Sequence, residues 1–247
     1  MALNKELDPR FAKAFGIVAG VIGFVIVYAL YASLGKLIPL HIDNAYLILY
    51  ADAILQGNVT LQGWELTTVG FYTELPFYVI AVSAFGVNSD LMRTVPAFIY
   101  TINLALIGGL IWRYRTLSSL WLMVPFAAFL LLPSNGVWHY GLHGAMHHVT
   151  TMAALICLYF MGEDLLGTPK SRSVLFMLAA VATWADMAFA FFLALPVVMA
   201  TLYYYKGDSV RRLSSLRRVS FPLFVGTIVG FLLSRLMRTF GFDRLLE

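Results

Sequence analysis

Charge, cysteine and the common nucleotide-binding motifs are what this sequence has little of. Lysine, arginine, aspartate and glutamate make up 12% of its 247 residues, against about a quarter in an ordinary soluble domain. The single cysteine, Cys157, cannot form a disulfide within the chain. The sequence contains no glycine-rich phosphate loop, cysteine cluster or Ser/His/Asp arrangement, and its modest net charge of +4 is spread over short clusters. Nucleotide chemistry and nucleic-acid binding are therefore not expected.

Long apolar runs make up most of the sequence. Hydrophobic residues make up 60% of the chain, which predicts an all-α integral membrane protein. The first run begins near Phe11 and is longer than the core of a signal peptide, with no small-residue cleavage site after it, so we expect it to be retained. No soluble domain, long linker or repeat is visible. We predict a single transmembrane domain over residues 1–247.

Basic residues indicate which side of the membrane each loop faces. Residues 75–87 are apolar but too short to span, so we assign them to an interfacial helix. Seven spans then follow, with twelve of the 17 lysines and arginines inside. The expected spans are residues 14–38, 91–112, 117–132, 148–166, 173–183, 187–205 and 219–237. Residues 1–13 and the basic loop 206–218 are cytoplasmic, and the loop 39–90, with interfacial helices, is extracytoplasmic. The protein would lie in the plasma membrane, or the inner membrane if bacterial.

Candidate chemistry gathers on the outer face of this topology. The stretch 39–93 holds five of the 13 acidic residues, and four of the five histidines fall within 139–148. Asp186 lies at the turn between the fifth and sixth spans. Arg93 and Arg235 lie at outer span ends, where the positive-inside rule does not favour them. Polar groups at the membrane boundary are costly and often mark function.

Three short motifs in this arrangement resemble the GT-C superfamily of membrane glycosyltransferases. They are Asp43-Asn-Ala-Tyr46, Thr73-Glu74-Leu-Pro76-Phe-Tyr78, and Phe85-Gly86 followed by Arg93-Thr-Val-Pro96-Ala97. The resemblance covers roughly residues 14–238 and is to the conserved core of the protein O-mannosyltransferase and aminoarabinose transferase group. It implies transfer of a sugar from a polyprenyl-phosphate donor to an extracytoplasmic lipid, glycan or protein. Typical members carry further spans or a soluble domain, so we expect a partner subunit to supply acceptor binding.

The resemblance implies roles for two carboxylates. Asp43 is the candidate general base that takes the acceptor proton, and the alternative is a helix N-cap. Glu74 is its candidate helper and, with His147, the candidate ligand pair for a divalent metal. The alternative for Glu74 is a first-turn residue favoured by the helix dipole.

Histidines and arginines are the candidates for holding the donor phosphate. His139, His143 and His147 are spaced four apart, as on one helix face, and could contact phosphate or substrate or bind a metal. Arg93 and Arg235 could clamp phosphate, or could snorkel at the interface or simply end a span. Asp186 lies near the site in this interpretation and is an ordinary turn residue in the other.

Other functions remain open. The alternative is a non-catalytic membrane scaffold or partner subunit of a larger complex. A small transporter is less favoured because the span middles carry almost no charge, and a metal-dependent oxidoreductase would use the histidine loop. Gly16-x-x-x-Gly20 is a candidate helix-packing face or a chance pair.

Overall fold

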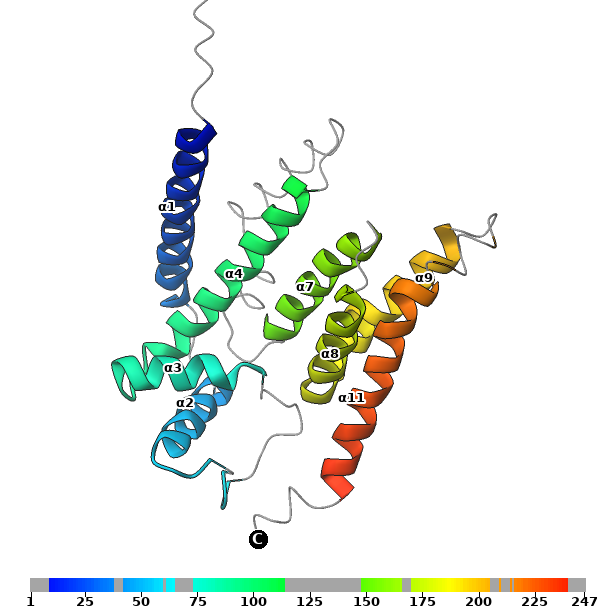
Figure 1. Cartoon of the computed structure of the whole chain (residues 1–247). Helices are drawn as coiled ribbons and strands as arrows, with labels where there is room; N and C mark the ends of the chain where they lie inside the picture. Colours follow the sequence, from blue (N-terminus) through cyan, green and yellow to red (C-terminus); the bar gives the residue numbers. More distant parts are fainter. Residues whose placement is uncertain are drawn as a thin grey trace, which may run out of the picture.

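A computed structural model describes residues 9–37, 42–59, 61–64, 73–113, 148–165, 170–204, 209, 214 and 216–239. Within these residues the regular structure is helical, with no strand, as predicted. The elements are α1 (Pro9–Gly35), α2 (Ile42–Leu55), α3 (Leu75–Phe85), α4 (Leu91–Arg113), α7 (His148–Leu165), α8 (Lys170–Ala185), the π-helical turn η3 (Ala190–Ala194), α9 (Leu195–Tyr204), the π-helical turn η4 (Leu216–Ser220) and α11 (Phe221–Thr239). Figure 1 shows their arrangement.

Two of the described helices are long and apolar enough to cross a membrane, α1 over residues 14–35 and α4 over residues 91–113. They coincide with the first two predicted spans. Helices also lie at the fourth, fifth and seventh predicted spans, but their apolar parts, residues 149–161, 172–185 and 221–236, are shorter. Within the described residues, the structure thus supports two of the seven predicted spans. The sixth predicted span contains the π-helical turn η3 before α9, and the seventh begins within the π-helical turn η4 before α11. The third predicted span, residues 117–132, lies outside the described residues.

Glycine and proline set the ends of the two helices between these spans. Gly57, with φ of 98°, follows the last residues of α2, and its N–H donates to the carbonyl of Ile54. A positive φ is where glycine ends a helix without steric cost. Pro76 lies in the first turn of α3, and Gly86 with φ of 71° ends it. The segment predicted to be interfacial is therefore a helix of 11 residues.

α1 and α4 run antiparallel. The rings of Tyr31 and Tyr100 lie edge to face with centroids 4.9 Å apart. Further along α1, a Cβ added to Gly35 would lie 3.5 Å from the Cβ of Arg93. Later residues of α1 thus contact earlier residues of α4, which places the end of α1 beside the start of α4. α2 and α3 lie at this same end of the molecule (Figure 1).

The second group of helices has its own core, and glycine controls its tightest contact. A Cβ added to Gly226 would lie 2.5 Å from the carbonyl oxygen of Phe176, and one added to Gly230 would lie 2.3 Å from that of Ala180. Such distances are too short for a side chain, so α8 and α11 touch backbone to backbone. Later residues of α11 contact later residues of α8, so the two helices run parallel. Buried side chains from α7, α8, η3, α9 and α11 complete the core beneath it.

α7 connects the two groups through its first turn. The side chain of Val149 is buried in the cluster formed mainly by α2, α3 and the start of α4. The next residue, Thr150, donates its hydroxyl proton to Asp186 at the end of α8 over 2.6 Å. α7 therefore runs antiparallel to α8 and begins at the end of the molecule where α1 ends.

The glycine pair in the first span has two interpretations, a packing face or a chance pair, and no packing contact is seen within the described chain. A Cβ at Gly16 or Gly20 would meet nothing within 4 Å. The residues of α1 around these glycines are exposed, among them Phe15, Val21 and Ile22. The close helix contact is made instead by the pair with the same spacing in α11.

Candidate functional site

The contacts above bring one end of each long helix to the same end of the molecule. These are the end of α1, the starts of α4 and α7, and the ends of α8 and α11, with α2 and α3 beside them. The same elements carry Asp43, Glu74, Arg93, Asp186 and Arg235. The structure thus gathers these five residues at one end of the helix assembly. We call this end the acidic end.

Asp43 lies in the first turn of α2, which begins at Ile42. Its side chain is outside what the structure describes. One turn later, the ring of Tyr46 stacks on that of Tyr50, with centroids 6.1 Å apart. The other aspartate of α2, Asp52, is partly exposed and accepts a hydrogen bond from Nε2 of Gln56 over 2.7 Å. Asp52 is thus a partly solvated helix residue.

Glu74 immediately precedes α3 and is only 1% exposed. Its side chain makes no capping hydrogen bond to the helix. Glu74 is the N-cap residue of α3, so the alternative of a residue favoured by the helix dipole stays open. A buried carboxylate needs polar or charged partners.

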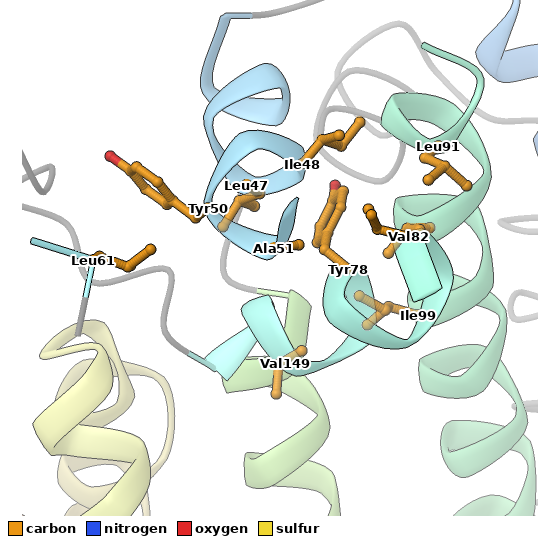
Figure 2. Close-up of a cluster of buried hydrophobic side chains, with 11 residues drawn as sticks. Leu47, Ile48, Tyr50, Ala51, Leu61, Tyr78, Val82, Leu91, Ile99 and Val149 are labelled. Atoms are coloured by element: carbon orange, nitrogen blue, oxygen red, sulfur yellow. The ribbon is translucent and has the colours of Figure 1, made fainter. Parts of the chain in front are cut away.

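Tyr78, one turn after Glu74, is the centre of the core beneath this end. Figure 2 shows its ring between Leu47, Ile48 and Ala51 of α2 and the α4 side chains Leu91 and Ile99. The ring is fully buried, and within the described chain its hydroxyl has no hydrogen-bond partner. Burial raises the pKa of Tyr78 well above its usual value, and the negative charge of Glu74 raises it further. Tyr78 is therefore a neutral phenol that connects α2, α3 and α4.

Arg93 lies in the first turn of α4, on the side that faces α1. It is partly buried, and its Nε atom has no hydrogen-bond partner among the described residues. An unpaired guanidinium nitrogen is a strong donor for a phosphate oxygen. Arg235, near the end of α11, is exposed, and its guanidinium lies 5.4 Å from the centroid of the Phe231 ring.

Asp186 follows the last residue of α8 and is 6% exposed. Its Oδ1 accepts a hydrogen bond from the backbone N–H of Ala188 over 2.9 Å, as in an Asx turn. Its Oδ2 accepts the hydroxyl of Thr150 over 2.6 Å. Both oxygens are thus engaged by the protein itself. This arrangement agrees with the interpretation of Asp186 as a turn residue, and gives the turn a partner in α7.

The histidines expected to bind phosphate or metal, His139, His143 and His147, lie outside the described residues. In the part of the chain that the structure describes, no group of three or more histidine, cysteine, aspartate or glutamate residues is placed to hold a metal ion. His148 begins α7. The polypeptide therefore leads directly from the histidine loop to Val149 and Thr150.

Comparison of the chain with protein-family models, with curated proteins and with solved structures gave no match.

Two features of the site and its supports were missed in the sequence. Thr150 gave no signal, because a threonine in an apolar helix commonly bonds to its own backbone, as Thr101 does to the carbonyl of Ala97 over 2.7 Å. The Gly226-x-x-x-Gly230 pair was visible as a spacing, but the same spacing occurs at Gly16 and Gly20, where nothing packs.

Proposed function

We propose that this chain is the seven-span membrane core of a GT-C-type glycosyltransferase that uses a polyprenyl-phosphate sugar as donor. The observation that carries the proposal is the gathering of Asp43, Glu74, Arg93 and Asp186 at the acidic end. The motifs of the resemblance also fall at element boundaries there. They open α2, open α3, and run from the end of α3 into α4.

In the proposed reaction the acceptor hydroxyl attacks the anomeric carbon of the donor. The new bond joins the acceptor oxygen to that carbon, and the bond from the carbon to the phosphate oxygen breaks. The phosphate leaves with the bonding electron pair, as polyprenyl phosphate, and the configuration inverts. Asp43 takes the acceptor proton. Arg93 and one or more of His139, His143 and His147 hold the phosphate charge.

Glu74 is the second carboxylate of the proposal. Its burial beside Tyr78 fixes its position at the start of α3, so it could orient the acceptor. Glu74 and His147 remain the pair expected to hold a divalent cation, and no step is assigned to that ion. The proposed orientation has residues 1–13 and 206–218 in the cytoplasm, with the acidic end outside.

The central test replaces Asp43. Asp43→Asn removes the base but keeps the size and polarity of the side chain, so we expect turnover to fall by about 10²–10⁴-fold without loss of folded protein. The assay follows release of polyprenyl phosphate from a panel of polyprenyl-phosphate hexoses and pentoses incubated with membranes that contain the protein. Asp52→Asn, on the same helix but hydrogen-bonded to Gln56, is the matched control and should leave turnover unchanged. Equal turnover in Asp43→Asn and wild type would remove the proposal.

A non-catalytic scaffold or partner subunit is the second candidate, and one observation favours it. Most of α1 before its last two turns is exposed in this chain, including Ile17, Val25 and Ile26. A span that packs little within its own chain leaves apolar surface for another membrane protein or for lipid. Wild-type protein that releases no polyprenyl phosphate, but is recovered with one stoichiometric partner chain, would favour this function.

A further inference from the structure

Thr150 makes a side-chain hydrogen bond that reaches from the start of α7 to the turn after α8. Its hydroxyl donates to Oδ2 of Asp186 over 2.6 Å, and the two residues are 36 positions apart in the sequence. Thr150 is 1% exposed and Asp186 is 6% exposed. Solvent therefore cannot replace this bond when it is lost.

Val149, the neighbour of Thr150, connects this hydrogen bond to a second group of helices. Successive residues of a helix point about 100° apart, so Val149 and Thr150 serve different neighbours. Val149 is buried with Tyr78, Val82 and the apolar side chains of α2 and α4, as Figure 2 shows. Thr150 holds the turn at Asp186. One helical turn therefore fixes the α2–α3–α4 group against the α8–η3 turn.

The acidic end depends on that turn. α2 carries Asp43, and α3 begins after Glu74. The histidines His147 and His148 are two or three residues before Thr150 in the chain. A shift of the first turn of α7 would move both sets of residues relative to Asp186, and small displacements of reacting groups cost large factors in rate.

We propose that Thr150 is a positioning residue of this site. Its hydroxyl, bonded to the Asp186 carboxylate, holds the start of α7 in register with α2 and α3 and so sets the geometry of the acidic end. The inference rests on the proposed function for its effect on turnover. Its effect on the local structure does not depend on that function.

Thr183 provides a matched control within the same protein. It is also 1% exposed and lies in α8, but its hydroxyl has no hydrogen-bond partner among the described residues. Threonine to valine is nearly isosteric at both positions. The two substitutions therefore differ chiefly in whether a hydrogen bond to a carboxylate is removed.

Amide hydrogen exchange in detergent or nanodiscs tests the structural part. In Thr150→Val we expect exchange at the first turn of α7 and at residues 186–190 to rise about tenfold, the loss of one charge-assisted bond. Thr183→Val should change it less than about twofold, and Thr150→Ser, which keeps the hydroxyl, should restore the wild-type rates. Equal exchange in the two valine variants, or no rescue by serine, would overturn the proposal. If Thr150→Val is not recovered folded, Asp186→Asn takes its place, because the amide removes the carboxylate charge from the bond to Thr150 and should raise exchange at the same residues by a smaller factor.

Turnover with polyprenyl-phosphate sugars tests the functional part. We expect kcat of Thr150→Val to fall about tenfold with little change in donor KM, and Thr150→Ser to recover it. Faster exchange with unchanged kcat would make the bond purely structural and would overturn the positioning role. A wild-type protein that transfers no sugar would instead contradict the proposed function, and the exchange comparison would still decide whether the bond holds the turn.

Discussion

At the scale of single residues, the buried polar groups of this protein differ in whether they have a hydrogen-bond partner within the described chain. The carboxylate of Asp186 has both oxygens hydrogen-bonded. The hydroxyl of Tyr78 is fully buried and, within the described chain, has no partner. Removing a polar group has opposite consequences in these two cases, because an unpaired buried group costs free energy that a paired one does not.

Tyr78→Phe is therefore expected to keep or raise stability. Loss of an unpaired buried hydroxyl should leave the free energy of unfolding unchanged or increase it by about 1–3 kcal/mol. Reversible unfolding in mixed micelles at neutral pH measures this. A loss of about 1 kcal/mol or more would mean that the hydroxyl has a partner.

The pH dependence of the free energy of unfolding, compared between wild type and Tyr78→Phe, is a second measurement. The pKa of Tyr78 is raised in the folded state above its ordinary value of 10.0. The resulting stability is complete below pH 10 and is lost as the pH rises through the folded pKa, because the unfolded tyrosine ionises first. Wild type should therefore lose stability above pH 10 more steeply than Tyr78→Phe. Parallel curves would contradict the burial of this phenol.

Part of the site could be predicted at this scale and part could not. The acidic residues near span ends were visible because few charges occur in the sequence. The partner of Asp186 was not, because a hydrogen bond across 36 residues depends on how helices pack. Glu74 was found, but its near-complete burial was not, since it depends on how α2 and α4 pack around the start of α3.

At the scale of helices, length and apolar composition predicted where most described elements lie. α1, α3, α4 and α7 begin or end within a few residues of their predicted limits. Their partners were not predictable from spacing alone. Two glycine pairs of the same spacing occur. The pair in α11 contacts α8, while the pair in α1 meets nothing within 4 Å among the described residues.

Alanine at the two glycine pairs should separate these cases. Gly230→Ala would place a methyl group 2.3 Å from the carbonyl oxygen of Ala180, and overpacking of this kind destabilises by about 1–3 kcal/mol or more. Gly20→Ala meets nothing within 4 Å and should be neutral or slightly stabilising, because alanine is the better helix former. Apparent melting temperatures in detergent compare the two. A destabilised Gly20→Ala protein would show that α1 packs through that face.

At the scale of the whole molecule, charge counting and helix packing agree on which helix ends belong together. The positive-inside rule assigned the end of α1, the starts of α4 and α7 and the ends of α8 and α11 to one side. The contacts place these ends at one end of the described structure. Which side of a membrane that end faces is a separate prediction.

Cysteine labelling tests that orientation, and Cys157 makes it simple because it is fully buried. Gln62 and Ser209 are both exposed, and each is replaced by cysteine in turn. On intact cells, a membrane-impermeant maleimide should label Gln62→Cys but not Ser209→Cys, and should label both after permeabilisation. Wild type should stay unlabelled. Labelling of Ser209→Cys on intact cells would reverse or exclude the proposed topology.

The backbone contact between α8 and α11 has a consequence for motion. Because Gly226 and Gly230 leave no room between these helices, we expect the pair to move as one stiff body. If the proposed lipid-linked donor enters from the side, the motion that admits it would then concentrate where the α1–α4 group meets the α7–α11 group. In the described chain, the first turn of α7 lies on that seam. We expect this turn to be the pivot of such a motion.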